Sequence, residues 1–377
     1  MEGSANLPLT GLTVIAIEQA VAAPFCSAKL ADAGARVIKI ERPEGDFARG
    51  YDKVAAGQSS YFVWLNRGKE SLVLDLTSSA DQGTLRDVIS RADVMIQNLK
   101  PGVLARLGFD CRALRQAHPR LITCSISGYG ETGPLSNRKA YDLLIQAESG
   151  LSSITGGPAE PARVGISVVD IATGITAYSA ILEALIARAV TGEGAAIQVS
   201  MFDVMADWLT VPLLHQEAGK PPSRQGLSHP SIAPYGVFKS RDEKDILISI
   251  QSDREWARFS AVFLEDPAAA QDERFASNVA RVRNRAATDA LVAAAFANLD
   301  AAASVARLSE ADIAYASVND MAALSNHPHL RRITVDTPAG PVSFPAPAPI
   351  FAGLSRSYGA VPGLGDSNLP HGKARSP

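Results

Sequence analysis

The feature that most constrains the fold of this chain is an alternation, over its first 200 residues, of short β-branched runs with longer amphipathic stretches. Residues 13–18 (TVIAIE) and 35–41 (ARVIKIE) are typical of strands, and residues 24–34 between them are typical of a helix that ends at Gly34. Further apolar strand candidates lie at residues 71–76, 93–98 and 121–127. Continuous apolar strands that alternate with helices need cover on both faces, so the pattern predicts an α/β fold with a mostly parallel sheet.

The alternation continues beyond these strands. Helices are expected over residues 81–92 and 101–118, which have helical spacing and capping residues at their starts. Residues 165–169 (GISVV) predict another strand, and residues 171–190 predict a helix that is apolar most of the way round and therefore deeply buried. A further strand and helix are expected at residues 195–203 and 205–219.

The later part of the chain predicts a second, smaller domain. Residues 220–234 are dense in Pro, Ser and Gly and mark a domain boundary or an active-site loop. Residues 235–252 predict a β-hairpin, and the Ala-rich stretch as far as Leu324 predicts helices. The Pro-rich tail from Asn326 cannot support a helix interior. We expect a large domain in residues 1–210, a linker and a small α+β domain in 211–325, and a segment 326–377 that returns to the large domain or ends as extended arms.

Composition excludes several classes of protein. The 377 residues are 46% hydrophobic and 20% charged, as in a folded soluble protein. The 36 basic and 39 acidic residues give 36 − 39 = −3, so no basic field exists to bind a nucleic acid. Cys26, Cys111 and Cys124 have neither disulfide-framework nor metal-ligand spacing, and the six histidines indicate no metal site. The start has no basic signal region and no apolar run approaches the ~20 residues that span a bilayer, so we expect no membrane partner and a cytoplasmic location.

Residues 128–133 (GYGETG) fit the glycine pattern of dinucleotide-binding loops and follow a predicted strand. A dinucleotide fold would begin a helix there, but Pro134 and the polar residues after it predict a loop, and no strand-end acid follows about 20 residues later. The pattern favours a glycine-rich loop that approaches some ligand, with an ordinary turn as the simpler interpretation.

Asp170 is expected at the junction of the predicted strand 165–169 and the long helix, in the N-cap position. Asp is among the best N-caps and needs no chemical role to explain it there. However, the carboxyl end of a buried strand is also the edge at which ligands bind in open α/β sheets. The helix dipole would keep the carboxylate ionised, as a nucleophile requires.

Basic residues recur at the predicted strand ends: Arg42, Arg49, Arg67 with Lys69, Arg106, and Arg138 with Lys139. Each alone is explained as a solvated surface charge. If they converge on the glycine-rich loop, they suit a phosphorylated ligand, because Arg and Lys bind phosphate through charge-assisted hydrogen bonds.

Six motifs, in order, resemble those of the class III CoA-transferases, the family of formyl-CoA transferase and carnitine CoA-transferase. They lie at residues 11–49, 66–76, 92–110, 119–134, 140–156 and 168–185. The resemblance implies a Rossmann-like large domain built from the N-terminal half and the C-terminal tail, a small domain between them, and an interlocked homodimer. It also implies that Asp170, in the sequence DIATG, is the nucleophile.

The resemblance further implies an acyl-CoA and a carboxylate as substrates, with no tightly bound cofactor. Asp170 attacks the thioester to give a mixed anhydride, which the CoA thiolate converts to an aspartyl-CoA thioester, and the acceptor carboxylate then reverses the sequence. The family's CoA contacts fall here on Gln19, Ala20, Ala22, Arg42, Leu74, Asn98, Leu99, Arg106, Lys139 and Tyr141.

Two other functions are weighed against this one. The α-methylacyl-CoA racemases are similar through the N-terminal half but use a His and Asp pair, and the His position corresponds here to Ala140, before Tyr141 and Asp142. A non-catalytic CoA-thioester sensor would need only the phosphate-facing residues and not Asp170.

Residues 41–71 resemble the subgroup that acts on C4 and C5 dicarboxylic acids such as mesaconyl-CoA, citramalate, itaconate, malate and succinate. The glycine-rich active-site loop of formyl-CoA transferase is replaced here by residues 226–236. The second carboxylate of such a substrate needs a cation or several donors, for which Arg49, Tyr51 and His229 are candidates, each also explained as an ordinary surface or loop residue.

Overall fold

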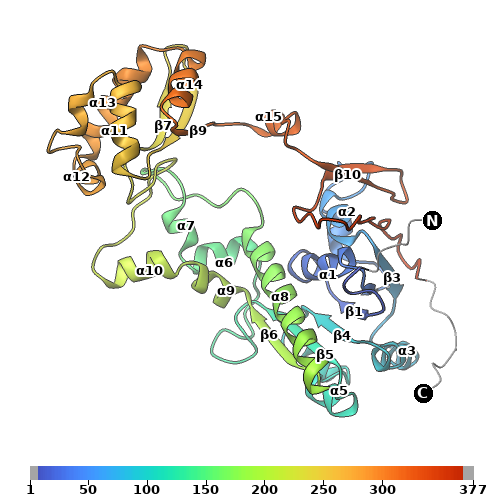
Figure 1. The fold of residues 1–377 in the computed structure, drawn as a ribbon. Helices are drawn as coiled ribbons and strands as arrows, with labels where there is room; N and C mark the ends of the chain where they lie inside the picture. The colour runs from blue at the N-terminus through green and yellow to red at the C-terminus, as the bar shows by residue number, and fades with distance from the viewer. Residues whose placement is uncertain (1–6, 368–377) are drawn as a thin grey trace. The chain divides into compact units, whose positions relative to one another are not determined.

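The computed structural model describes residues 7–367, which divide into two compact units (Figure 1). The large unit consists of the residues up to Leu151, Arg163–Val211 and the residues from Arg331 onward. The small unit consists of Ser152–Ala162 and Pro212–Leu330. Each unit has a hydrophobic core of its own.

A six-stranded parallel sheet forms the centre of the large unit, with the strand order β3-β2-β1-β4-β5-β6. The strands are β1 (Thr13–Ile17), β2 (Arg36–Glu41), β3 (Lys69–Val73), β4 (Val94–Gln97), β5 (Ile122–Ser127) and β6 (Ala196–Ser200). This is the doubly wound order of Rossmann folds, in which the chain reverses its direction across the sheet between β1 and β4. The predicted α/β class with a mostly parallel sheet is confirmed.

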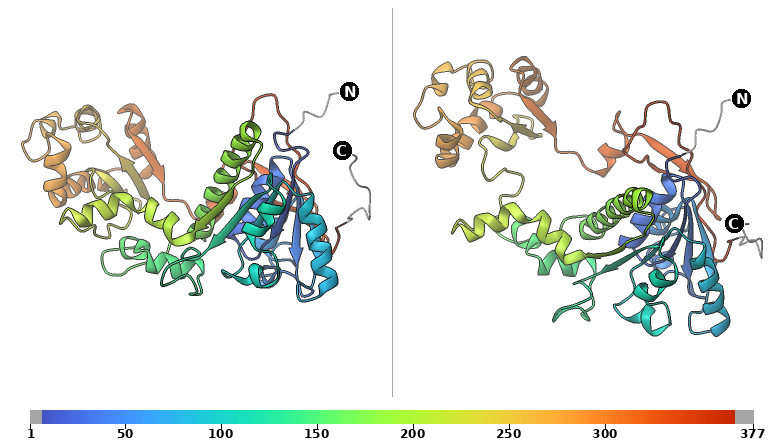
Figure 2. Two further views of the ribbon diagram at one scale, coloured as in Figure 1. Left: turned by 90° about the horizontal axis from the view of Figure 1, so that it is seen from below. Right: turned by 60° about the horizontal axis from the view of Figure 1, so that its bottom comes forward.

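Helices cover both faces of this sheet (Figure 2). The helices that cover it are α1 (Ala22–Asp32) and α8 (Val168–Thr191) on one face, and α3 (Ser79–Ser90), α4 (Val103–Arg106) and α5 (Cys111–Ala117) on the other. Alternate residues of each strand point to opposite faces, so that Val14 joins the core under α1 and α8, and Ile15 joins the other core.

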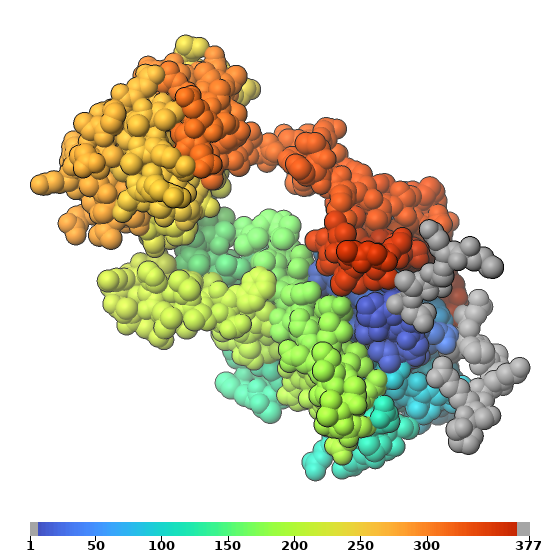
Figure 3. All heavy atoms as spheres, viewed as in Figure 1, coloured from blue at the N-terminus to red at the C-terminus, as the bar shows by residue number. Residues whose placement is uncertain are grey.

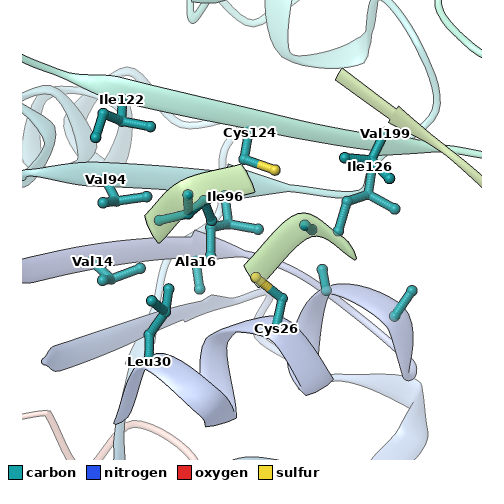
Figure 4. Close-up of a cluster of buried hydrophobic side chains, with 14 of the residues drawn as sticks. Val14, Ala16, Cys26, Leu30, Val94, Ile96, Ile122, Cys124, Ile126 and Val199 are labelled. Carbon is teal, nitrogen blue, oxygen red and sulfur yellow. The ribbon is translucent and has the colours of Figure 1, made fainter. Parts of the chain in front are cut away.

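The core under α1 and α8 contains two of the three cysteines. Cys26 of α1 and Cys124 of β5 are buried among aliphatic side chains such as Leu30 and Ile96 (Figure 4). Cys111 is half-buried, and all three thiols are unpaired. Burial raises the pKa of the Cys124 thiol to about 12, so this group is uncharged and unreactive at neutral pH.

Several expected elements differ from those found. The strand expected over residues 195–203 ends at Ser200, and the helix expected over 205–219 is two helices, Met201–Trp208 and Thr210–Glu217. Residues 165–169 form no strand, because α8 already begins at Val168, and Asp170 lies in its first turn and is not the N-cap. The predicted helix over residues 101–118 is two helices, α4 and α5. Gly108 adopts a left-handed conformation (φ 83°) between them, and Asp110 accepts a hydrogen bond from Ala113 N to begin the second.

Helix α8 is long and apolar enough to cross a bilayer by length and composition, with 24 residues and a mean hydropathy of 1.5 in its most apolar window. The expectation that no apolar run reaches this length is therefore wrong, because Glu183 and Arg188 interrupt the run only sparsely. One side of α8 packs on α1 and the sheet. The expectation that this helix is deeply buried holds for one side only, since Ile186 and Val190 on its outer side are 70% and 86% exposed.

The small unit contains an antiparallel sheet of β7 (Tyr235–Lys239), β8 (Asp245–Ser249) and β9 (Ala314–Ser317). The predicted hairpin is β7 and β8. The predicted Ala-rich helices are present and pack on the sheet around Trp256 and Phe296. Helices of this unit are α11 (Asp253–Val262), α12 (Asn278–Arg283), α13 (Arg285–Ala297), α14 (Ala301–Glu310) and α15 (Met321–Ser325), with a 3-10 turn at Pro267–Ala270.

The C-terminal tail packs on the large unit, where its atoms lie against N-terminal residues (Figure 3). Its hairpin, β10 (Arg332–Val335) and β11 (Val342–Pro345), covers Phe62 of α2 (Ser60–Asn66). Gly68 N donates a hydrogen bond to Ala360 O, and a Cβ on Gly359 would lie 2.7 Å from Gly68 Cα, so this approach requires glycine.

The remaining elements are a 3-10 turn at Phe47–Gly50, α6 (Asp142–Glu148), α7 (Leu151–Ile154), α9 (Met201–Trp208) and α10 (Thr210–Glu217).

Candidate active site

A cavity of about 620 Å³ lies in the large unit at the carboxyl ends of β1 and β4, where the strand order reverses. Ligands of doubly wound sheets bind at this point because the loops after the two strands part there. Gln19 and Ala20 line the cavity after β1, and Asn98 and Leu99 line it after β4. The fold therefore makes this cavity the candidate binding site.

The structure brings most of the predicted site residues together in this cavity. Those that line it are Gln19, Ala20, Ala22, Asn98, Leu99, Lys139, Tyr141 and Asp170. Three others do not line it. Arg42 is exposed and donates a hydrogen bond to Gly45 O, Leu74 is buried in the core under α3, and Arg106 is exposed at the end of α4.

Asn98 joins the two loops at the point where the strand order reverses. Its Oδ1 accepts a hydrogen bond from Gln19 N at 2.9 Å, and its Nδ2 donates to Gln19 O at 2.8 Å. Both polar atoms of the Asn98 amide are therefore hydrogen-bonded within the protein. The side chain of Asn98 therefore fixes the Gln19 backbone beside the cavity, which is a positioning role that the sequence does not reveal.

A buried ionic network lies directly behind Ala20, which has a left-handed backbone (φ 62°). The carboxylate of Asp46 accepts a hydrogen bond from Ala20 N at 3.2 Å and pairs with Lys39 Nζ at 2.9 Å. Lys69 Nζ pairs with Glu18 at 2.7 Å, and all four charged side chains are buried. We infer that this network holds the turn that carries Gln19 and Ala20, because a non-glycine residue keeps this conformation only where its surroundings impose it.

Three of the seven predicted basic residues pair with buried acidic side chains of the large unit. Lys69 pairs with Glu18, Arg67 pairs with Asp32, and Arg49 pairs with Glu41 through two hydrogen bonds of 2.9 and 2.7 Å. These residues do not converge on the glycine-rich loop, so that expectation is wrong for them. Arg138 and Lys139 do line the cavity.

Asp170 reaches the cavity from the first turn of α8. The backbone N–H groups of Val169 and Asp170 both donate to Asp142 Oδ1, at 2.8 and 3.3 Å. Burial and, second, the charge of Asp142 raise the pKa of Asp170 to about 7. The expectation that the helix dipole keeps this carboxylate ionised is wrong near neutral pH, since burial and a like charge outweigh the dipole.

A family model, CoA-transferase family III, matches residues 9–368. The chain belongs to this family. An acetyl-CoA:oxalate CoA-transferase of Acetobacter aceti is 38% identical over 342 residues, which cover 90% of this chain and 87% of that protein. A succinate-glutarate CoA-transferase of Agrobacterium fabrum is 39% identical over 74% of this chain and 72% of its own. A succinyl-CoA:mesaconate CoA-transferase of Haloarcula hispanica is 35% identical over 85% and 83%.

The fold of the family III chain matches a solved structure as well. A CAIB/BAIF family protein from Brucella suis is 34% identical, with a TM-score of 0.81, and the match covers 96% of this chain and 97% of that one. The predicted family is therefore confirmed, and the chain is a CoA-transferase of class III that acts on CoA thioesters.

Aromatic hydroxyl groups form one wall of this CoA-transferase's cavity. Tyr51 and Tyr61 line it with ring centroids 5.6 Å apart, and Tyr61 Oη lies 3.3 Å from Ser167 Oγ. Burial, followed by the charges of Asp46 and Asp170, raises the pKa of Tyr51 to about 12. Tyr51 therefore remains a hydrogen-bond donor at every physiological pH. Of the other candidates for a substrate carboxylate, Arg49 is occupied by Glu41, and His229 lies in the small unit, stacked on Tyr235.

The glycine-rich segment 128–133 is a loop in the CoA-transferase, as the sequence predicts, and no helix begins there. Gly128 lines the cavity, and a Cβ added to it would lie 2.2 Å from Ala140 Cβ. This glycine thus allows the loop to approach the segment that leads to Tyr141 and α6. Within residues 7–367, no group of three or more His, Cys, Asp or Glu side chains is arranged to hold a metal ion.

Proposed function

We propose that this enzyme transfers CoA between dicarboxylic acids of four or five carbons through an aspartyl-CoA thioester on Asp170. The observation that carries the proposal is the position of Asp170: a half-buried carboxylate in the cavity at the reversal of the strand order, in a chain of CoA-transferase family III. The cytoplasmic location and the absence of nucleic-acid and membrane partners stay predictions from the sequence.

The proposed steps balance without an added proton or cofactor. A carboxylate oxygen of Asp170 attacks the thioester carbonyl, the C–S bond breaks, and CoA leaves as a thiolate. The thiolate attacks the Asp170 acyl carbon of the anhydride, which releases the first acid as a carboxylate and leaves the aspartyl-CoA thioester. The carboxylate of the second acid then attacks the aspartyl-CoA thioester, the C–S bond breaks, and CoA leaves as a thiolate from a second mixed anhydride. The thiolate attacks the acyl carbon of the second acid, which forms the new acyl-CoA and frees the carboxylate of Asp170. Binding of the CoA portion restrains the reacting groups between these steps.

Dicarboxylate acceptors are supported by the relatives and by the cavity wall. The three relatives above carry the names of oxalate, succinate, glutarate and mesaconate transferases. The Tyr51 and Tyr61 hydroxyls offer donors for a second carboxylate, and Arg163 on the same cavity offers a cation. We assign the second carboxylate to this group of residues.

The racemase alternative is not favoured by any observation. The position that would hold its histidine is Ala140, and no histidine is among the described residues that line the cavity. A proton could not be removed there by an imidazole. A sensor without catalysis would not need a carboxyl of raised pKa beside the binding loops.

A panel of CoA donors and acids tests the substrate class. We expect succinyl-CoA to pass its CoA to glutarate or mesaconate at least about tenfold faster than to formate or carnitine, because only a dicarboxylate uses the second set of donors, a difference of about 1.4 kcal/mol. Mass spectrometry of the CoA products measures the exchange. Tyr51→Phe should lower the ratio of the rate with dicarboxylates to the rate with formate or carnitine. Activity confined to oxalate or to monocarboxylic acids would contradict the C4 and C5 assignment.

We also propose an obligate homodimer with interlocked chains, as the family resemblance implies. The large unit is discontinuous, since the chain leaves it after Val211 and returns at Arg331. We expect sedimentation velocity at submicromolar concentration to detect only dimer, because interlocked chains cannot separate without unfolding. A stable folded monomer would rule the interlocked arrangement out.

A further inference from the structure

The N-terminus of α8 is capped by a residue from another helix. Ser167, at the N-cap position, makes no side-chain capping hydrogen bond. Asp142, the first residue of α6, accepts hydrogen bonds from Val169 N and Asp170 N through Oδ1. Its Oδ2 accepts one from Gln146 Nε2 at 2.7 Å, and Gln146 Oε1 accepts one from Val164 N at 2.8 Å. The first turn of α8 is thus fixed by α6.

This cap places a second carboxylate beside Asp170. An Asn or Ser acceptor would satisfy the two N–H groups equally well, so capping alone does not require a charge. The charge has a cost, because like charges at this distance oppose each other's ionisation. The dipole of α8 favours an anion at its N-terminus and offsets part of this cost, but the charge of Asp142 acts on Asp170 as well.

We propose that Asp142 is a positioning residue of the transfer reaction: its carboxylate orients Asp170 and, by repelling the free carboxylate, favours the acylated forms of Asp170. This inference rests on the proposed function, in which Asp170 is the nucleophile. The carboxylate of Asp170 carries a full negative charge before it attacks the thioester. In the mixed anhydride and in the aspartyl-CoA thioester the Asp170 side chain is uncharged, and the negative charge has moved to the CoA thiolate or to the released acid.

Acylation of Asp170 therefore relieves its repulsion with Asp142. The repulsion acts on the free carboxylate and not on the acylated side chain, so it raises the free energy of the resting state relative to both covalent states. The same charge makes the Asp170 oxygen more basic and therefore a stronger nucleophile. The shift of the Asp170 pKa has the same sign, with burial as its larger cause and Asp142 as the second.

Other titratable or charged side chains also line the cavity and enter the interpretation of any pH profile. They are Tyr51, Asp52, Tyr61, Lys100, Arg138, Lys139, Tyr141 and Arg163. Asp52 is the carboxylate on this list, and its side chain accepts hydrogen bonds from Val54 N, Ser60 N and Ser60 Oγ. Asp142 is thus the cavity carboxylate in hydrogen-bond contact with the first turn of α8.

Asp142→Asn tests this inference, because Asn keeps an acceptor for Val169 N and Asp170 N but removes the charge. The Nδ2 of the new asparagine would face the donor Nε2 of Gln146, and two donors cannot pair. The double variant Asp142→Asn with Gln146→Glu is therefore made as well. It restores a donor and an acceptor at this contact without returning a charge to position 142. The carboxyl ¹³C resonance of Asp170, identified by its absence in Asp170→Asn, is titrated in each protein. We expect its midpoint to fall by about one pH unit in Asp142→Asn, and by less in the double variant because Gln146→Glu returns a carboxylate to the neighbourhood of Asp170.

The second readout is the fraction of enzyme that hydroxylamine traps at Asp170 during incubation with succinyl-CoA, measured by mass spectrometry at pH 8, where Asp170 is ionised in all variants. We expect this fraction to fall severalfold in Asp142→Asn. An unchanged midpoint together with an unchanged trapped fraction overturns the role of Asp142 and leaves the proposed function intact. Absence of trapping in the wild type overturns the nucleophile itself, and with it this role.

Discussion

Asp170→Asn should lose CoA transfer by at least about 10³-fold, because the amide cannot form the anhydride that the proposed cycle requires. CoA-thioester binding should survive, since most of the described residues that line the cavity, including those of the loops after β1 and β4, lie outside α8. Turnover at saturating substrate and acyl-CoA affinity by calorimetry separate the two effects. Asp170→Ala, which cannot revert to Asp by deamidation, serves as the matched control.

The same substitution should make the protein more stable at pH 8. A carboxyl whose pKa is raised from 3.8 to about 7 on folding binds its proton more tightly in the folded state. This group therefore lowers the free energy of unfolding as the pH rises from about 4 to about 7, by up to about 4 kcal/mol. Asn carries no charge to be penalised, so the stability gain should be present above pH 7 and absent near pH 4. Thermal melts of both proteins across this range measure it.

Wild-type enzyme should be inactivated by hydroxylamine only in the presence of an acyl-CoA, with the modification at Asp170. A variant with Asn at this position that turns over like the wild type, or a wild-type enzyme that hydroxylamine inactivates without acyl-CoA, would remove the support for a covalent mechanism.

The fold was readable from the sequence because its signals are local. Continuous apolar strands, such as residues 13–18, and amphipathic helices between them are typical of a covered parallel sheet and of little else. The order of the strands was not predicted, and the family resemblance implied only a Rossmann-like large domain. The error at residues 165–169 has a non-local cause: the β-branched run predicts a strand, but Asp142, more than 20 residues earlier, caps the chain as a helix.

The candidate site was predictable where one residue both carries the chemistry and belongs to a motif, as Asp170 does. It was not predictable where a charged side chain forms an ion pair with a residue of another helix or strand. Arg67 and Lys69 read as surface cations, yet their partners Asp32 and Glu18 come from α1 and the end of β1. One signal was available: Lys39 stands inside the apolar strand VIKIE, where a charge must be paired.

Lys39→Met should destabilise the large unit by about 3–5 kcal/mol, because it leaves buried carboxylates without their partner. Lys39 Nζ lies 2.9 Å from Asp46 and 3.5 Å from Glu18, and none of these side chains is exposed to solvent. Lys69 remains to balance Glu18 but makes no ion pair with Asp46. Burial lowers the pKa of Lys69 to about 8 despite the charge of Glu18, and the charge of Lys39 lowers it further. Lys39→Met should therefore return Lys69 toward its charged form, which keeps Glu18 balanced and leaves Asp46 as the carboxylate without its ion pair.

Lys239→Met is the matched control for this effect, since the ion pairs of Lys239 with Glu243 and Asp245 are exposed and at 3.5 Å. We expect the urea midpoint to fall for Lys39→Met and to stay near that of the wild type for Lys239→Met. Because Asp46 also holds Ala20 N, Lys39→Met should in addition raise the KM for acyl-CoA, through the turn that carries Gln19. Equal midpoints for the two variants would show that the network behind Ala20 does not stabilise the fold. Loss of a partner costs a buried charge far more free energy than it costs an exposed charge, so a stabilising network requires the two midpoints to differ.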